Sequence, residues 1–280
     1  MKNPTSVAVL LTTFNSEPFL IELIESILGQ DNSDWTLFIS DDGSSDRTPE
    51  IINYYAELHT GKVILIGFPE KNMGASLGFD RLLRHIESPY YMFCDHDDIW
   101  LPNKINRSLS EMKAAEMKFP KTPVLVHTDL TVVDRKLNML AHSFAEFSKI
   151  NPAKFGNYKF LSVANCVTGC TIMLNDQAKK CILPVPDSSI MYDWWIALNV
   201  SRQGRIIYIP EQTVLYRQHD KNVLGAKKAG IPYMVSAFVH LNQTINADLD
   251  KIKVLRVFGD VGIFKYLYYK ILFQFKRYFR

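Results

Sequence analysis

The residues best suited to chemistry form one short cluster, Asp95-His96-Asp97-Asp98, which directly follows the apolar run 90–94. Three carboxylates this close together repel one another unless a cation offsets their charge. An Asp-x-Asp pair in a turn can place both carboxylates on one Mg²⁺ or Mn²⁺ ion, or one on the ion and the other on a sugar hydroxyl. Because these ions often share their ligands with substrate phosphates, the cluster indicates a metal–diphosphate site. The alternative is a solvated loop that caps the next helix.

Three more polar clusters follow apolar runs along the chain. Thr12-Thr13-Phe14-Asn15 comes after residues 7–11, Asp41-Asp42-Gly43-Ser44 after residues 36–40, and Asn72-Met73-Gly74 after residues 63–66. A single cluster of this kind is often only a turn or a helix cap. Four clusters at corresponding positions indicate a site, because ligands of open α/β sheets bind at the carboxyl ends of the strands.

The elements that must position these clusters alternate regularly. Each apolar run is followed by a segment of helical periodicity, at residues 17–30, 48–58, 75–86 and 102–117. Four strand–helix repeats predict an α/β fold with a mostly parallel central sheet flanked by helices. Beyond residue 120 the pattern predicts strands at 124–127, 170–174 and 206–209 and a helix at 190–201, which we expect to complete the same sheet and hold a second substrate.

Composition limits the classes of function. The 280 residues are 47% hydrophobic, which allows a large core, and the net charge of +3 argues against binding nucleic acid through bulk charge. Neither a second cysteine pair nor a nearby histidine completes a zinc set around Cys166 and Cys170, so we expect all four cysteines to be reduced thiols. The sequence shows no signal-peptide pattern and no uncharged stretch of the ~18–20 residues that cross a bilayer, so we expect a cytoplasmic protein.

Several motifs, taken in their order and spacing, resemble those of the family 2 glycosyltransferases, which have the GT-A (nucleotide-diphospho-sugar transferase) fold. These motifs are LLTTFN, SDDGSSD, NMG, CDHDDIWLPNKI, VTGCTIMLN, YDWW and LYRQHDKNVLG. The resemblance covers roughly residues 5–225 and is strongest to bacterial enzymes that build surface polysaccharides, rhamnosyltransferases among them. It implies a catalytic domain at 1–225, with a nucleotide-sugar half at about 1–120 and an acceptor half at about 121–225, and a C-terminal helical extension at 226–280.

The resemblance implies that seven residues contact the nucleotide end of the donor or order the loops around it: Thr12, Phe14, Asn15, Asp41, Asp42, Asn72 and Asp95. Thr12 and Asp42 match the contacts to base and ribose, Phe14 matches a stacking aromatic, and Asp95 is assigned to ribose or donor sugar. A carboxylate can accept a hydrogen bond from the N3–H of uracil or thymine. We therefore expect a UDP- or dTDP-sugar as donor, with dTDP-rhamnose a specific candidate.

The metal and the catalytic base are also assigned by the resemblance. Asp97 is expected to bind Mn²⁺ or Mg²⁺, and His219 is a second candidate ligand, while His96 should point away and Asp98 should cap the following helix. Asp193 matches the general base of transfer with inversion, in which one carboxylate takes the proton of the acceptor hydroxyl. An N-cap role for Asp193 is the alternative.

Four other residues complete the expected site. Arg217 is a candidate partner for the diphosphate, with an ordinary surface position as the alternative. Trp194 or Trp195 is a candidate apolar wall against a sugar, with core packing as the alternative, and Gly169 allows close backbone approach. Many relatives carry Glu-Asp where this chain has Tyr192-Asp193, which leaves Asp193 as the local base and the role of Tyr192 open.

The C-terminal residues 261–280 combine basic and apolar positions. Five cations follow Asp260, the last acidic residue, and seven apolar side chains at spacings of three and four form one helical stripe: Phe264, Leu267, Tyr268, Ile271, Leu272, Phe275 and Phe279. Such a helix is suited to peripheral contact with an anionic membrane on the inner face of the cell. Docking on the catalytic domain and homodimerisation are the alternatives. The resemblance implies a saccharide or polyprenyl-linked saccharide acceptor.

Two other functions compete with an inverting, metal-dependent glycosyltransferase. A sugar-nucleotide pyrophosphorylase should carry a glycine-rich loop with Arg and Lys after its first strand, and residues 12–18 contain none of these. A non-catalytic nucleotide-sugar-binding module would have lost its acidic residues, whereas Asp42, Asp97 and Asp193 are all present.

Overall fold

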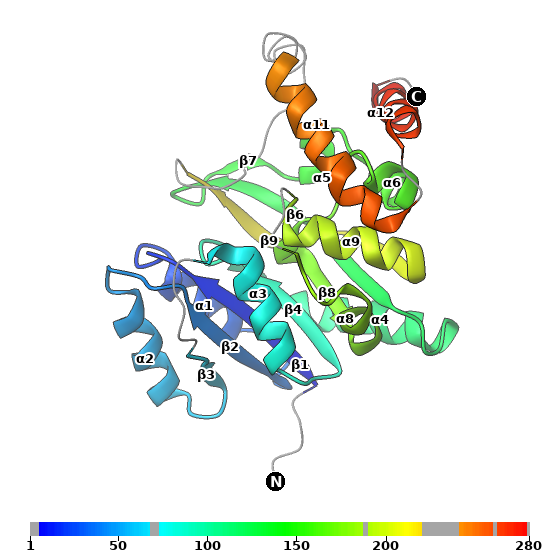
Figure 1. Cartoon of the computed structure of the whole chain (residues 1–280). Helices are drawn as coiled ribbons and strands as arrows, with labels where there is room; N and C mark the ends of the chain where they lie inside the picture. The colour runs from blue at the N-terminus through cyan, green and yellow to red at the C-terminus, as the bar shows by residue number, and fades with distance from the viewer. Residues whose placement is uncertain (1–5, 68–72, 187–189, 220–240, 260–261, 279–280) are drawn as a thin grey trace.

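The computed structural model describes residues 6–67, 73–186, 190–219, 241–259 and 262–278, so Asn72 lies outside the described residues. One central sheet with strand order β3-β2-β1-β4-β8-β6-β9-β5 runs through the molecule, and helices cover both of its faces (Figure 1). Buried apolar side chains form a separate cluster on each face of this sheet. The sheet is therefore a middle layer, and its strand ends form the rim of the molecule's main cleft.

The first half of the sheet is parallel. β1 (Val7–Thr13) pairs with β2 (Trp35–Asp41) and β4 (Tyr90–Cys94), and β3 (Val63–Leu65) pairs with β2. Nearly every side chain of β1 is buried, as expected for a strand covered by helices on both faces. The parallel arrangement brings the carboxyl ends of these strands to one edge, as the sequence predicts.

Three helices connect these strands, α1 (Leu20–Leu28), α2 (Thr48–Leu58) and α3 (Gly74–His85), and α4 (Lys104–Lys118) leads on to the second half of the sheet. Their positions confirm the helical segments predicted from periodicity. In α1 the buried residues recur at the helical spacing of three and four, which places its apolar face against the sheet.

The second half of the sheet is mixed. β8 (Ile172–Asn175) lies antiparallel between β4 and β6 (Val124–Asp134), and β6 pairs in parallel with β9 (Arg205–Gln218). The short strands β5 (Ile99–Trp100) and β7 (Met139–Ala141) are antiparallel to β9 and β6. The predicted parallel arrangement therefore describes the first half, while the second half also contains antiparallel pairs.

β6 and β9 extend well beyond their predicted ends. The apolar pattern of β6 stops at His127, but the strand continues because its polar side chains find buried partners. Thr128 shares a hydrogen bond of 2.7 Å with Thr213, and Asp129 accepts one from Ser143 (2.5 Å). Buried polar groups that form hydrogen bonds are tolerated inside a sheet. Hydrophobic periodicity alone does not predict such a polar continuation of a strand.

Short helices fill the region between β7 and β9: α5 (Phe144–Ser148), α6 (Pro152–Phe155), α7 (Tyr158–Leu161), η1 (Gly169–Thr171), α8 (Asp176–Ile182) and α9 (Tyr192–Gln203). Capping side chains begin several of them. Ser143, Asn151, Asn157 and Asn175 each accept a hydrogen bond from a backbone N–H of the following turn. These caps explain how a segment with weak periodicity forms defined turns.

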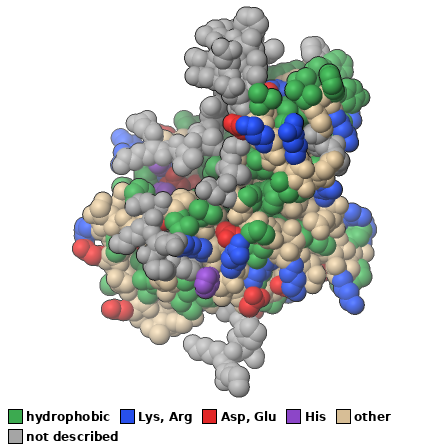
Figure 2. Space-filling view, viewed as in Figure 1, with side chains coloured by type: hydrophobic (Ala, Val, Ile, Leu, Met, Phe, Trp, Pro, Cys, Tyr) green, Lys and Arg blue, Asp and Glu red, His purple; other side chains and the backbone are tan. Residues whose placement is uncertain are grey.

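The C-terminal helices are α11 (Leu241–Leu255), η2 (Arg256–Phe258) and α12 (Ile263–Tyr278). α12 packs on the domain through buried Tyr266 and Phe273, and the ring of Phe273 lies 4.8 Å from that of Phe155. Five members of the predicted stripe remain 45–85% exposed: Phe264, Leu267, Tyr268, Ile271 and Phe275. Figure 2 shows apolar side chains gathered on this part of the surface.

Two further expectations concern cysteines and membrane spans. All four cysteines are free thiols, which confirms that prediction. Within the described residues, none of the helices combines the length and the apolar character that crossing a bilayer requires. Phe279, the last residue of the predicted stripe, lies outside the described residues.

Candidate active site

A cleft of about 1280 Å³ lies at the carboxyl ends of the parallel strands. Ten residues that the sequence predicts for the site line this one cleft: Thr12, Phe14, Asn15, Asp41, Asp42, Asp95, Asp97, Gly169, Asp193 and His219. They come from the ends of β1, β2 and β4, from η1 and α9, and from the residue after β9. The fold thus brings together residues that are more than 200 positions apart in the chain.

Asp41 holds the loop after β2 in shape. One oxygen accepts hydrogen bonds from the hydroxyls of Thr13 (2.8 Å) and Ser44 (2.6 Å), and the other accepts from the backbone N–H groups of Gly43 and Ser44. Asn15 adds a second link, because its backbone N–H donates to Ser44 and its side-chain oxygen accepts from the N–H of Ser45. The loops after β1 and β2 therefore form one unit.

Asp42 connects this unit to the start of α3. Its two carboxylate oxygens accept from the backbone N–H groups of Met73 (2.9 Å) and Gly74 (2.7 Å). Gly74 has φ of +78°, which a side chain would strain. Each carboxylate oxygen still has a lone pair for a ligand, so Asp42 can hold the loop and accept from a base at the same time.

Gly78 sets the distance between α3 and β1, and the sequence alone did not indicate it. A Cβ atom at position 78 would lie 2.7 Å from the methyl carbon of Thr12. The absence of a side chain lets α3 press directly against Thr12 at the edge of the cleft. Thr12 is thereby fixed at the edge of the cleft, at the end of β1.

The acidic cluster after β4 divides into carboxylates that line the cleft and one that does not. Asp95 and Asp97 line the cleft, and Oδ2 of Asp97 lies 2.9 Å from Nε2 of His219. The imidazole of His219 stacks on Phe19 with ring centres 4.8 Å apart. Burial and the charges of Asp97 and Asp193 raise the pKa of Asp95 to about 7. The crowding expected from the sequence is therefore present in the folded chain.

The other two members of the cluster differ from expectation. His96 lines the cleft instead of pointing away, and burial lowers the pKa of its imidazole. Asp98 is fully buried and accepts from the backbone N–H of Arg217 (3.1 Å), so it does not cap α4, which begins after Asn103 without a side-chain cap. The tight turn after β4 directs Asp98 into the core, and its pairing with β9 replaces the predicted cap.

Two sets of side chains could hold a cation. Asp95, Asp98 and Cys170 offer ligand atoms within 4.8 Å of one another, but Asp98 is sealed from the cleft and burial raises the pKa of the Cys170 thiol. Asp97 and His219 face the cleft at 2.9 Å, close to the ~3 Å between neighbouring ligands of an octahedral ion. A carboxylate and an imidazole also suit Mn²⁺ or Mg²⁺ better than a thiol does.

Asp193 lies in the first turn of α9 and faces the cleft. Its Oδ1 accepts from the backbone N–H of Trp194 (2.6 Å) and its Oδ2 from that of Gly169 (3.2 Å). Burial raises its pKa to about 6, although these backbone bonds partly offset the shift. The N-cap position belongs to Met191, so the alternative role predicted for Asp193 does not apply. A fixed carboxylate of this basicity can accept a proton near neutral pH.

Gly169 and Tyr192 position Asp193. The ring of Tyr192 packs between Phe79 (4.5 Å) and Phe93 (5.5 Å), which anchors the start of α9 in the core. A Cβ at position 169 would lie 2.0 Å from the hydroxyl oxygen of Tyr192, so only glycine fits there. Tyr192, which stands where many relatives carry the glutamate of a Glu-Asp pair, therefore has a packing role.

Trp194 and Trp195 do not line the cleft, and the predicted sugar wall is wrong for both. The indole N–H of Trp194 donates to the carbonyl of Leu161 (2.5 Å), and that of Trp195 donates to the carbonyl of Ile182 (2.8 Å). Successive residues of a helix point about 100° apart, so when Asp193 faces the cleft its two neighbours face the protein. Their alternative, core packing, is the observed one.

Arg217 also lies outside the cleft, so its predicted pairing with a diphosphate is a second correction. Its side chain is 3% exposed, and its guanidinium donates to Glu22 (2.5 Å) and to the carbonyls of Asp97 and Arg135. Alternation along β9 turns Tyr216 and Gln218 toward the cleft and Arg217 away from it. Arg217 instead supports the loop that carries Asp97.

The cations that do line the cleft were not singled out from the sequence. Among the described residues they are Arg81 on α3 and Arg135 and Lys136 in the turn between β6 and β7. The available signal was the run Asp134-Arg135-Lys136, a polar turn between two apolar segments. These three side chains supply the positive charge that the sequence analysis had assigned to Arg217.

Comparison with known proteins identifies the family. The model of glycosyl transferase family 2 matches residues 8–181, more than half of the chain. The chain belongs to glycosyl transferase family 2. It is 26% identical over 230 residues to dTDP-rhamnosyl transferase RfbG of Shigella flexneri, covering 77% of this chain and 74% of that protein. It is 23% identical over 203 residues to the putative teichuronic acid biosynthesis glycosyltransferase TuaG of Bacillus subtilis, covering 72% and 74%. The protein is thus a glycosyltransferase.

Solved structures agree with the GT-A fold of this glycosyltransferase. S. aureus TarS 1–349 in complex with UDP-GlcNAc superimposes with a TM-score of 0.60 at 14% identity, covering 96% of this chain and 81% of that one. The mannosyltransferase PcManGT from Pyrobaculum calidifontis, in complex with GDP-Man and Mn²⁺, gives a TM-score of 0.55 at 16% identity, covering 99% and 88%.

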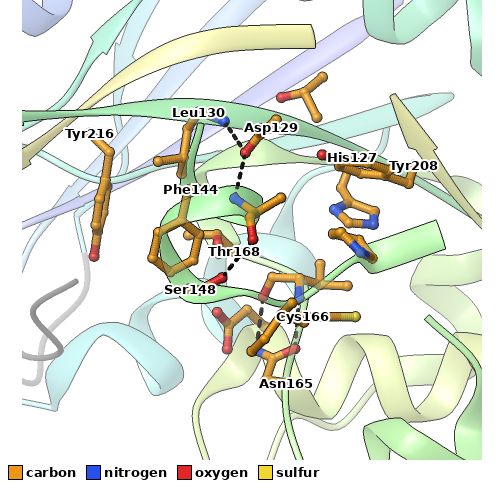
Figure 3. Close-up of a pocket in the computed structure, with 16 residues that line it drawn as sticks. His127, Asp129, Leu130, Phe144, Ser148, Asn165, Cys166, Thr168, Tyr208 and Tyr216 are labelled. Carbon is orange, nitrogen blue, oxygen red and sulfur yellow. Dashed lines mark hydrogen bonds between the residues drawn. The ribbon is translucent and has the colours of Figure 1, made fainter. Parts of the chain in front are cut away.

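A second, smaller cavity of about 190 Å³ adjoins the cleft (Figure 3). We call it the side chamber. It lies among β6, β9, α5 and the loop before η1, and it shares Thr168, Asp193 and Tyr216 with the cleft. The carboxylate of Asp193 therefore stands between two spaces.

Proposed function

We propose that this glycosyltransferase moves a sugar from UDP or dTDP to a saccharide or lipid-linked saccharide with inversion, in the synthesis of a bacterial surface polysaccharide. The observation that carries this proposal is the position of Asp42, Asp97 and Asp193 around a single cleft. Relatives named for dTDP-rhamnosyl transfer and teichuronic acid synthesis support the polysaccharide role.

Asp193 is the proposed general base. The acceptor hydroxyl gives its proton to the carboxylate of Asp193 while its oxygen bonds to the anomeric carbon of the donor. The bond from that carbon to the diphosphate breaks, and the nucleoside diphosphate leaves with the electron pair. A pKa of about 6 keeps the base deprotonated at neutral pH yet basic enough to assist.

Asp97 and His219 are the proposed residues for Mn²⁺ or Mg²⁺. When bound, such an ion supplies positive charge beside the diphosphate. GT-A enzymes generally use a divalent cation, and the neighbour PcManGT contains Mn²⁺. Arg81, Arg135 and Lys136 line the same cleft and add fixed positive charge for the phosphates.

The donor wall is suited to a pyrimidine nucleotide. Thr12, Phe14 and Asp42 meet at the ends of β1 and β2, where Phe14 is 48% exposed and free to stack on a base. Asp42 is the proposed acceptor for the N3–H of uracil or thymine. We propose that residues 1–225 contain these functions and that residues 226–280 form a C-terminal extension.

The test is a panel of UDP-, dTDP- and GDP-sugars, with release of the free nucleoside diphosphate as the readout. A UDP- or dTDP-sugar is expected to react first, only with Mn²⁺ or Mg²⁺, and chelation by EDTA should stop the release. Binding of a nucleotide without turnover of any donor in the presence of a crude lipid-linked saccharide fraction would favour the binding-module alternative.

We also propose that α12 contacts an anionic lipid surface from the inner side of the membrane. Phe264 and Ile271 are 85% and 71% exposed, and Lys265 and Lys276 accompany them on the same helix. The acceptor would then be presented at the surface where the enzyme binds.

Co-sedimentation with phosphatidylglycerol vesicles, and much less with phosphatidylcholine vesicles, is the expected result. The double change Phe264→Ser and Ile271→Ser should abolish it, while Tyr54→Ser, an exposed aromatic on α2, should not. Equal binding by both variants would contradict the lipid role. A monodisperse dimer that the double change converts to a monomer would assign the stripe to a homodimer instead.

A further inference from the structure

Arg217, near the end of β9, is a buried cation that joins three parts of the chain beside Asp97 and His219. Its Nε donates to the backbone carbonyl of Asp97 (2.8 Å), and its Nη1 donates to that of Arg135 (2.8 Å). Its Nη2 donates to the carboxylate of Glu22 on α1 (2.5 Å). The planar fork of a guanidinium fixes the relative positions of the groups that it contacts. The position of the loop that carries Asp97 therefore depends on what holds Arg217 in place.

Glu22 places a negative charge against this guanidinium. The side chain of Arg217 is 3% exposed and that of Glu22 is 52% exposed, so the cation of the pair is the buried partner. Removing one partner of a buried pair is costly because the remaining charge is less well balanced. Without Glu22, the positive charge of Arg217 beside the backbone of Asp97 would oppose the binding of a metal cation more strongly.

The ring of Phe19, at the N-cap position of α1, is a common surface for the groups around Asp97. The imidazole of His219 stacks on it, with ring centres 4.8 Å apart and 19° between the ring planes. The guanidinium carbons of Arg217 and Arg135 lie 4.9 Å and 5.6 Å from the centre of the Phe19 ring. Stacking on this ring restricts the orientation of His219, whose Nε2 lies 2.9 Å from Oδ2 of Asp97.

The start of α1 is a firm base for both side chains. Phe19 and Glu22 are three residues apart, a spacing that places side chains next to each other on a helix surface. This explains why both reach Arg217. The opposite face of α1 is anchored in the core through fully buried side chains, Leu20, Leu23, Ile24 and Ile27. A ligand pair held by a rigid element is preorganised for its ion.

We propose that Phe19 and Glu22 are positioning residues for the divalent cation, Phe19 through His219 and Glu22 through Arg217. This inference rests on the proposed function, whose metal ligands it uses, and assigns roles to two residues that lie far from the acidic cluster in the sequence. Each acts through another side chain. Replacing groups that hold metal ligands in place typically weakens metal binding by about 10- to 100-fold.

The experiment measures Mn²⁺ binding to the full-length enzyme saturated with UDP or with dTDP, from the loss of the EPR signal of free Mn²⁺. Glu22→Gln keeps a hydrogen-bond acceptor for Arg217 but removes the negative charge, so the Kd for Mn²⁺ should rise about tenfold. Nucleotide affinity without metal, measured by calorimetry, should not change.

Glu25→Gln is the matched control. It removes the same charge from an exposed position three residues further along α1, where the carboxylate accepts from the hydroxyl of Tyr55 (2.5 Å). The Kd for Mn²⁺ should be unchanged in this variant. The comparison separates the pairing with Arg217 from a general loss of negative charge on α1.

Phe19→Leu tests the stacked ring. It keeps an apolar side chain but removes the surface on which His219 stacks, so the Kd for Mn²⁺ should rise about two- to twelvefold. Phe19→Tyr restores the ring and should bind Mn²⁺ as the unaltered enzyme does. Thermal unfolding of each variant confirms that it is folded at the temperature of the titration.

Unchanged Mn²⁺ affinity in Glu22→Gln or in Phe19→Leu would overturn the positioning role of that residue and leave the proposed function standing. An equal loss of affinity in Glu25→Gln, or in Phe19→Tyr, would do the same. An unaltered enzyme that binds nucleotide but no Mn²⁺ would instead overturn the metal site of the proposed function, and both positioning roles with it.

Discussion

Each wall of the cleft holds one carboxylate, Asp42 or Asp193, through two backbone hydrogen bonds, but the two carboxylates have different proposed roles. On the donor wall, formed by the loops after β1 and β2, Asp42 accepts two backbone N–H bonds from the start of α3. On the acceptor wall, formed by η1 and the start of α9, Asp193 also accepts two, from Gly169 and Trp194. The bonds of Asp42 join it to a neighbouring loop, whereas those of Asp193 fix a buried base whose pKa is raised to about 6.

This difference suggests how binding and proton transfer are separated. Asp41, Asp42 and Asn15 form a network that shapes the donor wall. Next to the acceptor wall, Asp95 after β4 has its own pKa raised to about 7 by burial and by the charges of Asp97 and Asp193. Changes to the donor wall should therefore alter nucleotide affinity, and changes to the acceptor wall should alter the rate of transfer.

The largest expected effect comes from removing the base. Asp193→Asn keeps the size of the side chain but cannot take the acceptor proton, so kcat should fall about 10²–10⁴-fold. Nucleotide affinity, measured by calorimetry, should stay within about twofold. Asp176→Asn on α8, outside the cleft, is the matched control. Full transfer activity in Asp193→Asn would remove the distinction between the walls.

A smaller loss should follow from displacing the base without changing its chemistry. In Gly169→Ala the new methyl would overlap the hydroxyl of Tyr192 and shift the start of α9. A displacement of about 1 Å can cost about 10² in kcat, and overpacking costs about 1–3 kcal/mol of unfolding free energy. The double variant Gly169→Ala with Tyr192→Phe should regain part of both, which thermal unfolding and kinetics can measure.

The pH dependence of kcat/KM should follow the protonation of Asp193 on the acceptor wall. Below pH 6 the carboxylate of Asp193 becomes protonated and cannot accept a proton, so kcat/KM should fall about tenfold per pH unit. Nucleotide binding should be measured over the same range to separate affinity from rate. A profile that stays flat from pH 7 down to pH 5 would contradict the assignment of Asp193 as base.

The smallest effect is expected on the donor wall. Phe14→Ala removes a half-exposed ring whose stacking on a base is worth about 0.5–1.5 kcal/mol, so the Kd for UDP or dTDP should rise about two- to twelvefold. The kcat at saturating donor should not change. Ile21→Ala, also exposed but outside the cleft, is the control. A reduced kcat with unaltered Kd would show that the two walls are not functionally separate.

Much of the donor wall could be predicted because its residues are close in sequence to the strands that position them. The runs 7–11, 36–40 and 90–94 correspond to β1, β2 and β4, and the polar residues after each line the cleft. Residues that follow parallel strands lie at the same edge of the sheet, whichever strands are neighbours in it. The roles assigned to these residues remain predictions.

On the acceptor side it was harder to predict which side chains line the cleft, because the side chains of adjacent residues there point in different directions. Asp193 faces the cleft, whereas Trp194 and Trp195 face the protein. Arg217 likewise points to Glu22, and Arg81 and Arg135 take the place in the cleft that the sequence had suggested for it. A motif fixes neighbours along the chain, but helix and strand geometry decide which side chain points into a site.

The sequence by itself determined the alternation of strands and helices in the first half of the chain and the set of acidic residues at the strand ends, since these depend on local periodicity and spacing. Its motifs carried the resemblance to the family. Only the tertiary structure decided that Asp98 is buried, that the exposed stripe of α12 is left over after Tyr266 and Phe273 dock, and that His127 borders a chamber beside Asp193. The physical reason is that burial and side-chain direction depend on packing between segments far apart in the chain, which local pattern cannot specify.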